Sequence, residues 1–473
     1  MYEFPNTTRR IDLWEHTFPL SYKAFLQQAV SSFEEREYTW FFCGNAVFFL
    51  GMAMQLLLRH LVVYEITNTA ASLAWMTVAA VVVLPFMAPI AGVYVDRLNK
   101  RTILLFTEIS STLLFLGIGI LIVSGKVEFW HMLVTAPLFS IIFAFFMPAR
   151  QALVPALVPK HKLANALALT MGSNTLTQMI GPAIVGLSIF LTDHGITMLI
   201  VAGMFGLASI TDLRLPKHGM IGKQDSDESE SVLRSFWTDL SALINYLRNN
   251  QLIPLLLVFG MVLPLINFPL QQFMVVFAEK TFGDPGSKDF IAGLLISMLG
   301  VGSLIGALVS TNSDRFPHKG RLLMIGSFTA IIALGLFSIS NHLWIAIIFL
   351  AFMGFGQMIF QVTNNSSIQR IVENNMLGRV MSVVSLQWSL LPLGIIPLGF
   401  AIDRFGPGNS FGFTALFLFA LLAIMFFLTP QIRNLYMKPL KKIELSLVQA
   451  EKLVAEGKLT PEEAKKLTGE NET

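Results

Sequence analysis

Residues 92–101 read Gly-Val-Tyr-Val-Asp-Arg-Leu-Asn-Lys-Arg, and they stand where one long apolar stretch, 71–95, gives way to the next, 102–124. Each stretch is long enough to cross a bilayer, because about 20 apolar residues of helix span a hydrocarbon core about 30 Å thick. A short turn between two such helices lies at the membrane surface. There Asp96, followed by three cations, can bind a neighbouring helix N-terminus or a cation and hold two parts of the protein together.

The rest of the chain has the composition of a membrane protein. Of its 473 residues, 54% are hydrophobic and only 13% are charged, about half the charge of an average soluble domain. This composition excludes a disordered chain and a disulfide-stapled small protein, and it argues against a soluble enzyme. The net charge of +3 is too small to indicate a nucleic-acid partner. The single cysteine, Cys43, forms no internal disulfide and no thiolate metal site alone, so we expect no metal and no cofactor.

Twelve apolar stretches are long enough to be membrane spans. They are 39–64, 71–95, 102–124, 129–148, 163–191, 194–213, 252–279, 289–312, 320–340, 343–362, 377–401 and 409–432. The longest internal loop divides them into six and six, which suggests an internal duplication of the kind on which many transporters are built. We therefore expect an N-terminal segment 1–38, a six-helix half 39–213, a central loop 214–251 with an amphipathic helix, a second half 252–433 and a helical tail 434–473.

The loop charges predict the orientation of the chain in the membrane. Cytoplasmic loops carry an excess of Lys and Arg. With the N-terminus inside, the inner loops hold sixteen Lys and Arg, among them Arg150, and the outer loops hold four, Lys126, Lys280, Lys288 and Arg404. Both termini are predicted to be cytoplasmic, in a multi-pass protein of the inner (cytoplasmic) cell membrane.

A pattern related to residues 92–101 recurs in the second half. Residues 306–321 run from Gly306 through Ser310 and Asp314-Arg315 to Lys319-Gly-Arg321, between the eighth and ninth spans. The first copy resembles the signature loop of the major facilitator superfamily, with Asn99 in place of the usual turn glycine. This resemblance implies a conformational lock made by Gly92, Asp96, Arg97, Lys100, Arg101, Asp314 and Arg315.

The resemblance covers about residues 38–433 and implies an all-α fold. The fold has twelve transmembrane helices in two six-helix halves related by pseudo-two-fold symmetry. Two further segments, 148–166 and 378–382, resemble the branch of this superfamily that contains enterobactin exporters and macrolide-efflux proteins. The expected activity is transport by alternating access.

The fifth span contains Gly181, Pro182 and Gly186. Gly and Pro in a membrane helix allow close packing and a kink. The segment resembles the antiporter motif of the superfamily, in which the kinked helix is associated with export, although the final glycine pair is incomplete. A simple packing kink is the alternative interpretation.

Polar side chains at membrane depth usually face a cavity or another helix. The resemblance implies that spans one, five, seven and eleven line a central cavity, and these spans carry the candidate substrate-binding residues. They are Asn45, Gln55, Asn174, Gln178, Asn267, Gln271, Gln387 and Trp388. Hydrogen bonding between helices explains each residue equally well when it is taken alone. An amide-rich cavity in a chain rich in Phe and Met suits bulky amphipathic solutes.

Three titratable residues within or near the spans are candidates for proton coupling: Glu108 in span three, and His60 and Glu65 near the outer end of span one. Glu108 is preferred to Arg59, which precedes His60 in span one, because arginine stays protonated at biological pH whereas a partly desolvated carboxyl group can release its proton near neutrality. Arg59 lies near the end of its span, where an arginine can reach the outer surface.

The sequence therefore predicts a monomeric secondary transporter that uses the proton gradient to export an amphipathic organic molecule, a drug or a siderophore. The alternatives are a lysophospholipid flippase on the same fold and a membrane sensor or scaffold without transport. The chain contains no GxxxxGK[ST] loop for ATP and no HExxH motif, so we expect neither ATP-driven transport nor an enzyme.

Overall fold

The computed structural model describes residues 31–216, 243–262, 264–282, 287–310, 316–386 and 391–436, and throughout these ranges the regular structure is helical. The first half comprises α2 (Arg36–Thr67), α3 (Ala70–Arg97), α4 (Lys100–Val123), α5 (Phe129–Leu157), α6 (Leu163–Leu191) and α7 (His194–Asp212), with the short helices η1 (Ser31–Glu34) and η2 (Lys160–Lys162). The second half comprises α9 (Leu252–Val262), α10 (Pro264–Phe282), α11 (Lys288–Ser310), α12 (Lys319–Ser338), α13 (Leu343–Ile371), α14 (Asn374–Leu386), α15 (Leu391–Phe405), α16 (Pro407–Leu428) and α17 (Pro430–Arg433).

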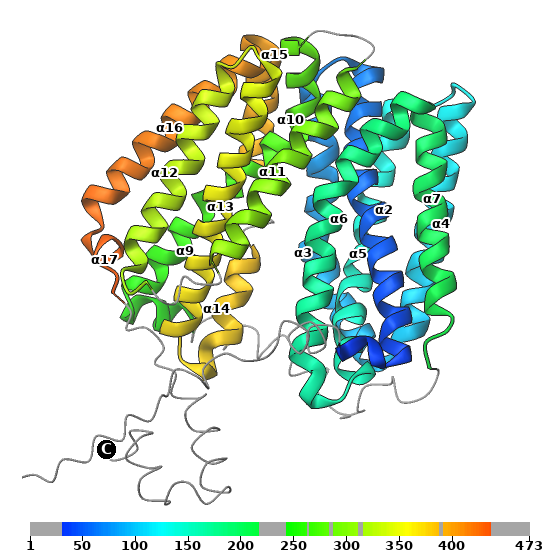
Figure 1. The fold of residues 1–473 in the computed structure, drawn as a ribbon, viewed down its shortest axis with the longest axis horizontal. Helices are drawn as coiled ribbons and strands as arrows, with labels where there is room; N and C mark the ends of the chain where they lie inside the picture. The colour runs from blue at the N-terminus through cyan, green and yellow to red at the C-terminus, as the bar shows by residue number, and fades with distance from the viewer. Residues whose placement is uncertain are drawn as a thin grey trace, which may run out of the picture.

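The predicted all-α fold of two six-span halves is confirmed (Figure 1). Ten of the described helices are long and apolar enough to cross a membrane. In the predicted seventh span the structure describes α9 and α10, on either side of residue 263, and in the eleventh α14 and α15, on either side of residues 387–390, which lie outside the described residues.

Two spans extend further than the sequence predicted. The fourth, expected at 129–148, continues as α5 to Leu157 with Pro148 and Pro155 inside the helix, and the tenth continues as α13 to Ile371. Proline in a membrane helix need not end it, since neighbouring groups satisfy the freed carbonyl. Arg150, which was assigned to an inner loop, therefore lies inside a helix.

Close approach of backbones holds the second half together. A Cβ atom on Gly302 of α11 would collide with the carbonyl oxygen of Ala351 in α13, and one on Gly354 of α13 would collide with the carbonyl oxygen of Leu299. Small residues favour such contacts in membranes, where helix association depends on packing and hydrogen bonds more than on the hydrophobic effect.

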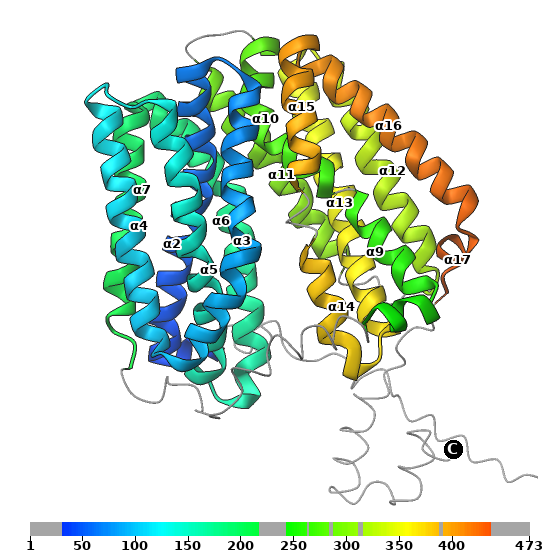
Figure 2. The same cartoon turned by 180° about the vertical axis from the view of Figure 1, so that it is seen from behind.

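The two halves are joined at the end of the bundle that the charge pattern predicts to be extracellular. There the carboxylate of Asp403, in α15, accepts hydrogen bonds from the backbone N–H groups of Ala70 (2.7 Å) and Ala71 (2.9 Å), which begin α3. Nearby, the backbone of Pro182 in α6 touches Gly293 in α11. Figures 1 and 2, seen from opposite sides, show the two groups of helices converging at this end and diverging toward the end that carries α14.

Candidate functional site

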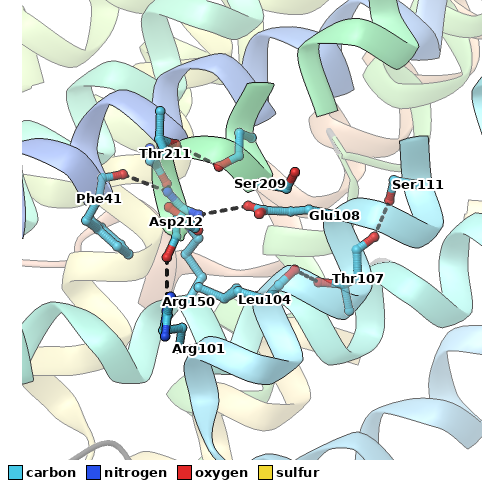
Figure 3. Close-up of polar contacts among 12 residues, drawn as sticks. Phe41, Arg101, Leu104, Thr107, Glu108, Ser111, Arg150, Ser209, Thr211 and Asp212 are labelled. Atoms are coloured by element: carbon cyan, nitrogen blue, oxygen red, sulfur yellow. Dashed lines mark hydrogen bonds and ion pairs between the residues drawn. The ribbon is translucent and has the colours of Figure 1, made fainter. Parts of the chain in front are cut away.

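A cluster of buried charges lies in the first half, where α4, α5 and α7 meet (Figure 3). One guanidinium nitrogen of Arg150, Nη1, lies 2.7 Å from Oδ2 of Asp212 and 3.3 Å from Oε1 of Glu108. The two carboxylate side chains are fully buried, and the arginine side chain is 3% exposed. Two acidic groups therefore share one nitrogen of a single cation away from solvent.

Helix α2 completes the surroundings of Arg150. Nε donates to Oδ1 of Asn45 (3.2 Å), and Nη2 donates to the carbonyl oxygen of Phe41 (2.7 Å), whose ring lies 4.3 Å below the guanidinium carbon. The amide nitrogen of Asn45 in turn donates to Oδ1 of Asn174 in α6 at 2.7 Å. Asn45 thus connects the charge cluster to the helix with the predicted antiporter kink.

Two features of the sequence allow α7 to approach so closely. Gly44 in α2 leaves room for its end, because a Cβ there would fall 2.5 Å from Oγ1 of Thr211 and 2.6 Å from Oδ1 of Asp212. Arg101, at the start of α4, donates through Nε to the carbonyl oxygen of Asp212 (3.3 Å) and through Nη2 to that of Leu213 (2.5 Å). A cation at these carbonyls satisfies acceptors that a helix C-terminus leaves without partners.

The cluster has the properties of a site that binds a proton. Glu108 and Asp212 each retain one buried carboxylate oxygen, Oε2 and Oδ1, that has no hydrogen-bond partner in the described part of the chain. An unpartnered charged oxygen away from water is costly. A proton on either carboxyl group lowers this cost, and its loss restores a net negative charge beside Arg150. Arg101, the second cation here, directs its guanidinium to main-chain carbonyls.

The predicted lock residues are only partly within the described side chains. Asn99 caps α4 by accepting from the N–H groups of Arg101 (3.0 Å) and Thr102 (3.4 Å), so it acts as a helix cap at the position of the family's turn glycine. Arg97 is exposed at the end of α3, while Lys100 is half-buried at the start of α4. Gly92 lies in α3, whereas the side chain of Asp96 and the residues Asp314 and Arg315 lie outside the described part.

The residues predicted to form the antiporter kink are buried at helix contacts. A Cβ on Gly181 would fall 2.6 Å from Cβ of Ala53 in α2, and one on Gly186 would fall 2.8 Å from Cα of Phe290 in α11. Together with the contact between Pro182 and Gly293, this makes α6 one of the helices that join the charge-bearing half to the other half.

The candidate cavity residues are divided among several environments. Asn45 and Asn174 are hydrogen-bonded to each other, and Gln55 is buried and accepts from Nη1 of Arg59 (3.4 Å). Gln178 is exposed and Gln271 half-buried. The side chains of Asn267, Gln387 and Trp388 lie outside the described set.

Arg59, in the outer part of α2, is buried, whereas the sequence predicted that its side chain would reach the outer surface. Its side chain does not reach the outer surface, since the residue is only 5% exposed, and His60 beside it is 4% exposed. The His60 ring bonds the carbonyl oxygen of Leu56 through Nδ1. Glu65, at the end of α2, is exposed and contacts His194 of α7.

Sequence reasoning did not identify three charged residues that form important contacts in the structure: Arg150 and Asp212 in the buried cluster, and Asp403 between the halves. Arg150 was treated as a loop cation although it stands in the segment 148–166 that carries a family resemblance, and Asp212 ends an otherwise apolar run. Asp403 also carried a signal: residues 399–406, Gly-Phe-Ala-Ile-Asp-Arg-Phe-Gly, repeat the Gly-x-x-x-Asp-Arg spacing of residues 92–97. A search for that spacing at every span end would have found it.

Comparisons with known proteins agree with this architecture. The family model described as Major Facilitator Superfamily matches residues 41–393. The chain is 22% identical to the Staphyloferrin A transporter of Staphylococcus aureus over 395 residues, 83% of this chain and 96% of that protein. It is also 22% identical to Macrolide efflux protein A of Streptococcus pyogenes over 376 residues, 78% and 90% of the two chains.

Solved structures give the same fold. A bacterial homologue of the human lysosomal transporter Spinster, in an inward-facing and unoccupied conformation, superposes with a TM-score of 0.66 at 15% identity, over 84% of this chain and 97% of that one. The nucleoside transporter NupG superposes with a TM-score of 0.65 at 15% identity, over 83% and 98%.

Proposed function

The chain belongs to the Major Facilitator Superfamily, and on that premise we propose that it is a secondary active exporter that exchanges protons for an amphipathic organic molecule. The proposal rests on one observation, the buried cluster of Glu108, Arg150 and Asp212. A transporter driven by a proton gradient needs a group that binds a proton in one conformation and releases it in another. Charged groups retained inside a membrane domain are expensive, and they commonly mark such pathways.

The arrangement of charges favours Glu108 as the proton carrier. Asp212 makes the shorter contact with Arg150, 2.7 Å against 3.3 Å, and its backbone carbonyl is held by Arg101. Each carboxyl group retains one oxygen without a partner in the described chain, so the difference between them is the longer contact of Glu108 with Arg150. A proton on Glu108 therefore costs the cluster less ion-pair energy than a proton on Asp212.

The relatives support an amphipathic organic substrate. They include proteins named for a siderophore and for macrolides, as well as the multidrug efflux pump Tap of Mycolicibacterium fortuitum, which is 25% identical over 355 residues. The exposed amide of Gln178 in α6 can form hydrogen bonds with such a solute without requiring a fixed charge on it. In the predicted orientation, the divergent end of the bundle faces the cytoplasm, from which an exporter takes its substrate.

The orientation is tested by labelling single cysteines. In a Cys43→Ser background, Ser124→Cys and Ser287→Cys should react with an impermeant thiol reagent added to intact cells, whereas Ser226→Cys and Ser446→Cys should react only after permeabilisation. The expectation follows from the distribution of loop cations, which removal of Arg150 from the loops leaves strongly asymmetric. Labelling of Ser226→Cys and Ser446→Cys in intact cells would contradict the predicted orientation.

The proton role is tested with Glu108→Gln, which keeps the size of the side chain and removes its titration. Everted vesicles with an imposed pH gradient are supplied with ethidium, erythromycin or staphyloferrin A, and accumulation is measured with and without an uncoupler. The wild-type chain should accumulate at least one of these compounds, and Glu108→Gln should lose gradient-driven accumulation while exchange of preloaded substrate persists.

Glu37→Gln is the matched control, since Glu37 is an exposed carboxylate near the start of α2. It should transport like the wild type. If Glu108→Gln also keeps gradient-driven transport, Glu108 is not the carrier. If the wild-type chain accumulates none of the compounds in either direction, the export proposal itself loses its support.

A further inference from the structure

A histidine links the two halves at the predicted extracellular end. His194, the first residue of α7, places Nδ1 3.2 Å from Oε2 of Glu65 in α2 and Nε2 3.2 Å from Oδ2 of Asp289 in α11. The His194 and Asp289 side chains are 17% and 16% exposed, and that of Glu65 is 56% exposed. The contact with Asp289 crosses between the halves, whereas the contact with Glu65 stays within the first half.

The geometry specifies the protonation state in which both contacts are favourable. An ionised carboxylate can only accept hydrogen bonds, and a neutral imidazole has one donor nitrogen and one acceptor nitrogen. Two carboxylates can therefore be bound at once only by the imidazolium, which donates from both nitrogens. After loss of one proton, a nitrogen lone pair faces one of the carboxylates, and that contact becomes repulsive.

The other charged groups near His194 are already engaged. Lys288 precedes Asp289 in α11, and its ammonium group lies 3.0 Å from the carboxylate of Glu279 in α10. Asp193 caps α7 by accepting from the N–H of Ile196 at 2.8 Å. Lys288 also interacts electrostatically with Glu65 and Asp289, but its direct contact is with Glu279, so His194 is the cation that contacts both carboxylates directly.

We propose that His194 is a second proton-binding site, which in its protonated form holds the predicted extracellular end closed through Asp289. The proposal rests on the orientation given above but requires no proton transfer at Glu108. The surrounding contacts, from Asp403 to α3 and from Pro182 to Gly293, close the same end without a group that titrates near neutral pH. His194 is the group that makes this closure sensitive to the external pH.

The site gives the transport cycle a direction. When the outer end is open, His194 is separated from Asp289 and is reached by protons from outside. Protonation then favours reassembly of both contacts, so closure of the outer end follows proton binding. A low external pH accordingly favours return of the empty transporter to the state that accepts substrate from the cytoplasm. Because the histidine side chain titrates between about pH 5 and 8, the closed state is favoured at the acidic end and weakened as the pH rises.

The proposal is tested by measuring the separation of the outer ends of the two halves as a function of pH. In the Cys43→Ser protein, Ser124→Cys at the end of α4 and Asn341→Cys before α13 carry spin labels, and the distance distribution is recorded in nanodiscs from pH 5 to 8. We expect the ratio of short to long distances to fall about tenfold over this range, the effect of losing one hydrogen bond to a charged group.

Three variants separate the proposal from a structural role of the histidine. His194→Gln should remove the pH dependence of the ratio, His194→Arg should keep the short distance at every pH because its charge is permanent, and Asp289→Asn should weaken the dependence strongly. His131→Gln, at a histidine of the same end that stacks on Trp130, should behave like the wild type. A pH dependence that survives in His194→Gln would overturn the proposal. The distance between the labels is measured without any transport assay. The test of His194 therefore does not depend on whether Glu108→Gln loses proton-coupled transport.

Discussion

Arg150→Met should abolish transport and lower the stability of the protein by about 3–5 kcal/mol, the usual effect of removing one partner from a buried ion pair. The substitution leaves Glu108 and Asp212 buried without their shared cation. It also removes the donors that hold Asn45 and the carbonyl oxygen of Phe41. Thermal unfolding of the detergent-solubilised protein measures the stability, and uptake into everted vesicles at matched expression measures the transport.

Two further proteins show whether the charge is responsible. Arg97→Met removes an exposed arginine at the end of α3 and should unfold at the wild-type temperature. The triple variant Arg150→Met, Glu108→Gln, Asp212→Asn removes both uncompensated carboxylates, so it should regain part of the lost stability without regaining transport. Wild-type transport by Arg150→Met would show that the cluster has no part in the cycle.

Two glycine substitutions should have large and different effects because one contact lies within a half and the other between halves. Gly302→Ala forces a methyl group into the carbonyl oxygen of Ala351 within the second half. This clash persists whichever end is open, and overpacking of this kind typically costs about 1–3 kcal/mol. Gly293→Ala places its methyl group against the backbone of Pro182 across the halves, and opening of the outer end relieves the clash.

We therefore expect Gly302→Ala to lower the unfolding temperature, and Gly293→Ala to lengthen the distance between labels at positions 124 and 341 with a smaller change in stability. Gly203→Ala is the control, because a Cβ there would meet no atom within 4 Å. If Gly293→Ala destabilises the protein as much as Gly302→Ala and leaves the distance unchanged, the contact between Pro182 and Gly293 does not open during the cycle.

The fold could be predicted from the sequence because span length and loop charge act locally. An apolar run of about 20 residues crosses a bilayer whatever its neighbours are, and the Gly-x-x-x-Asp-Arg loop adds a family resemblance that the comparisons confirm. What failed were decisions about helix ends. The predicted fourth span ended at residue 148, but α5 continues through Pro148 and Pro155, because inside a membrane the alternative to a helix is unsatisfied backbone.

The site could be predicted only in part because its members come together through packing. Glu108 was identified as an acid inside a span, which is a local observation. Arg150 and Asp212 stood near span ends, where charged residues usually mark the membrane surface, so nothing local distinguished them from anchors. The link from His194 to Asp289 joins residues far apart in sequence, and its prediction would require knowing which end of the two halves is closed.

The amide of Asn45 has a further consequence for how the two halves communicate. Its oxygen faces the N–H donor of Arg150 and its nitrogen faces the oxygen of Asn174, so a reversed amide would oppose donor to donor and acceptor to acceptor. The charge cluster therefore fixes the rotamer of a side chain on which α6 depends, and α6 touches α11 at Gly293. On the proposed function, proton binding at Glu108 and a displacement of α6 are expected to be thermodynamically linked, each changing the free energy of the other by the same amount. The substitution Asn45→Ala should lower this reciprocal coupling. It leaves Glu108, Arg150 and the contact between α6 and Gly293 in place.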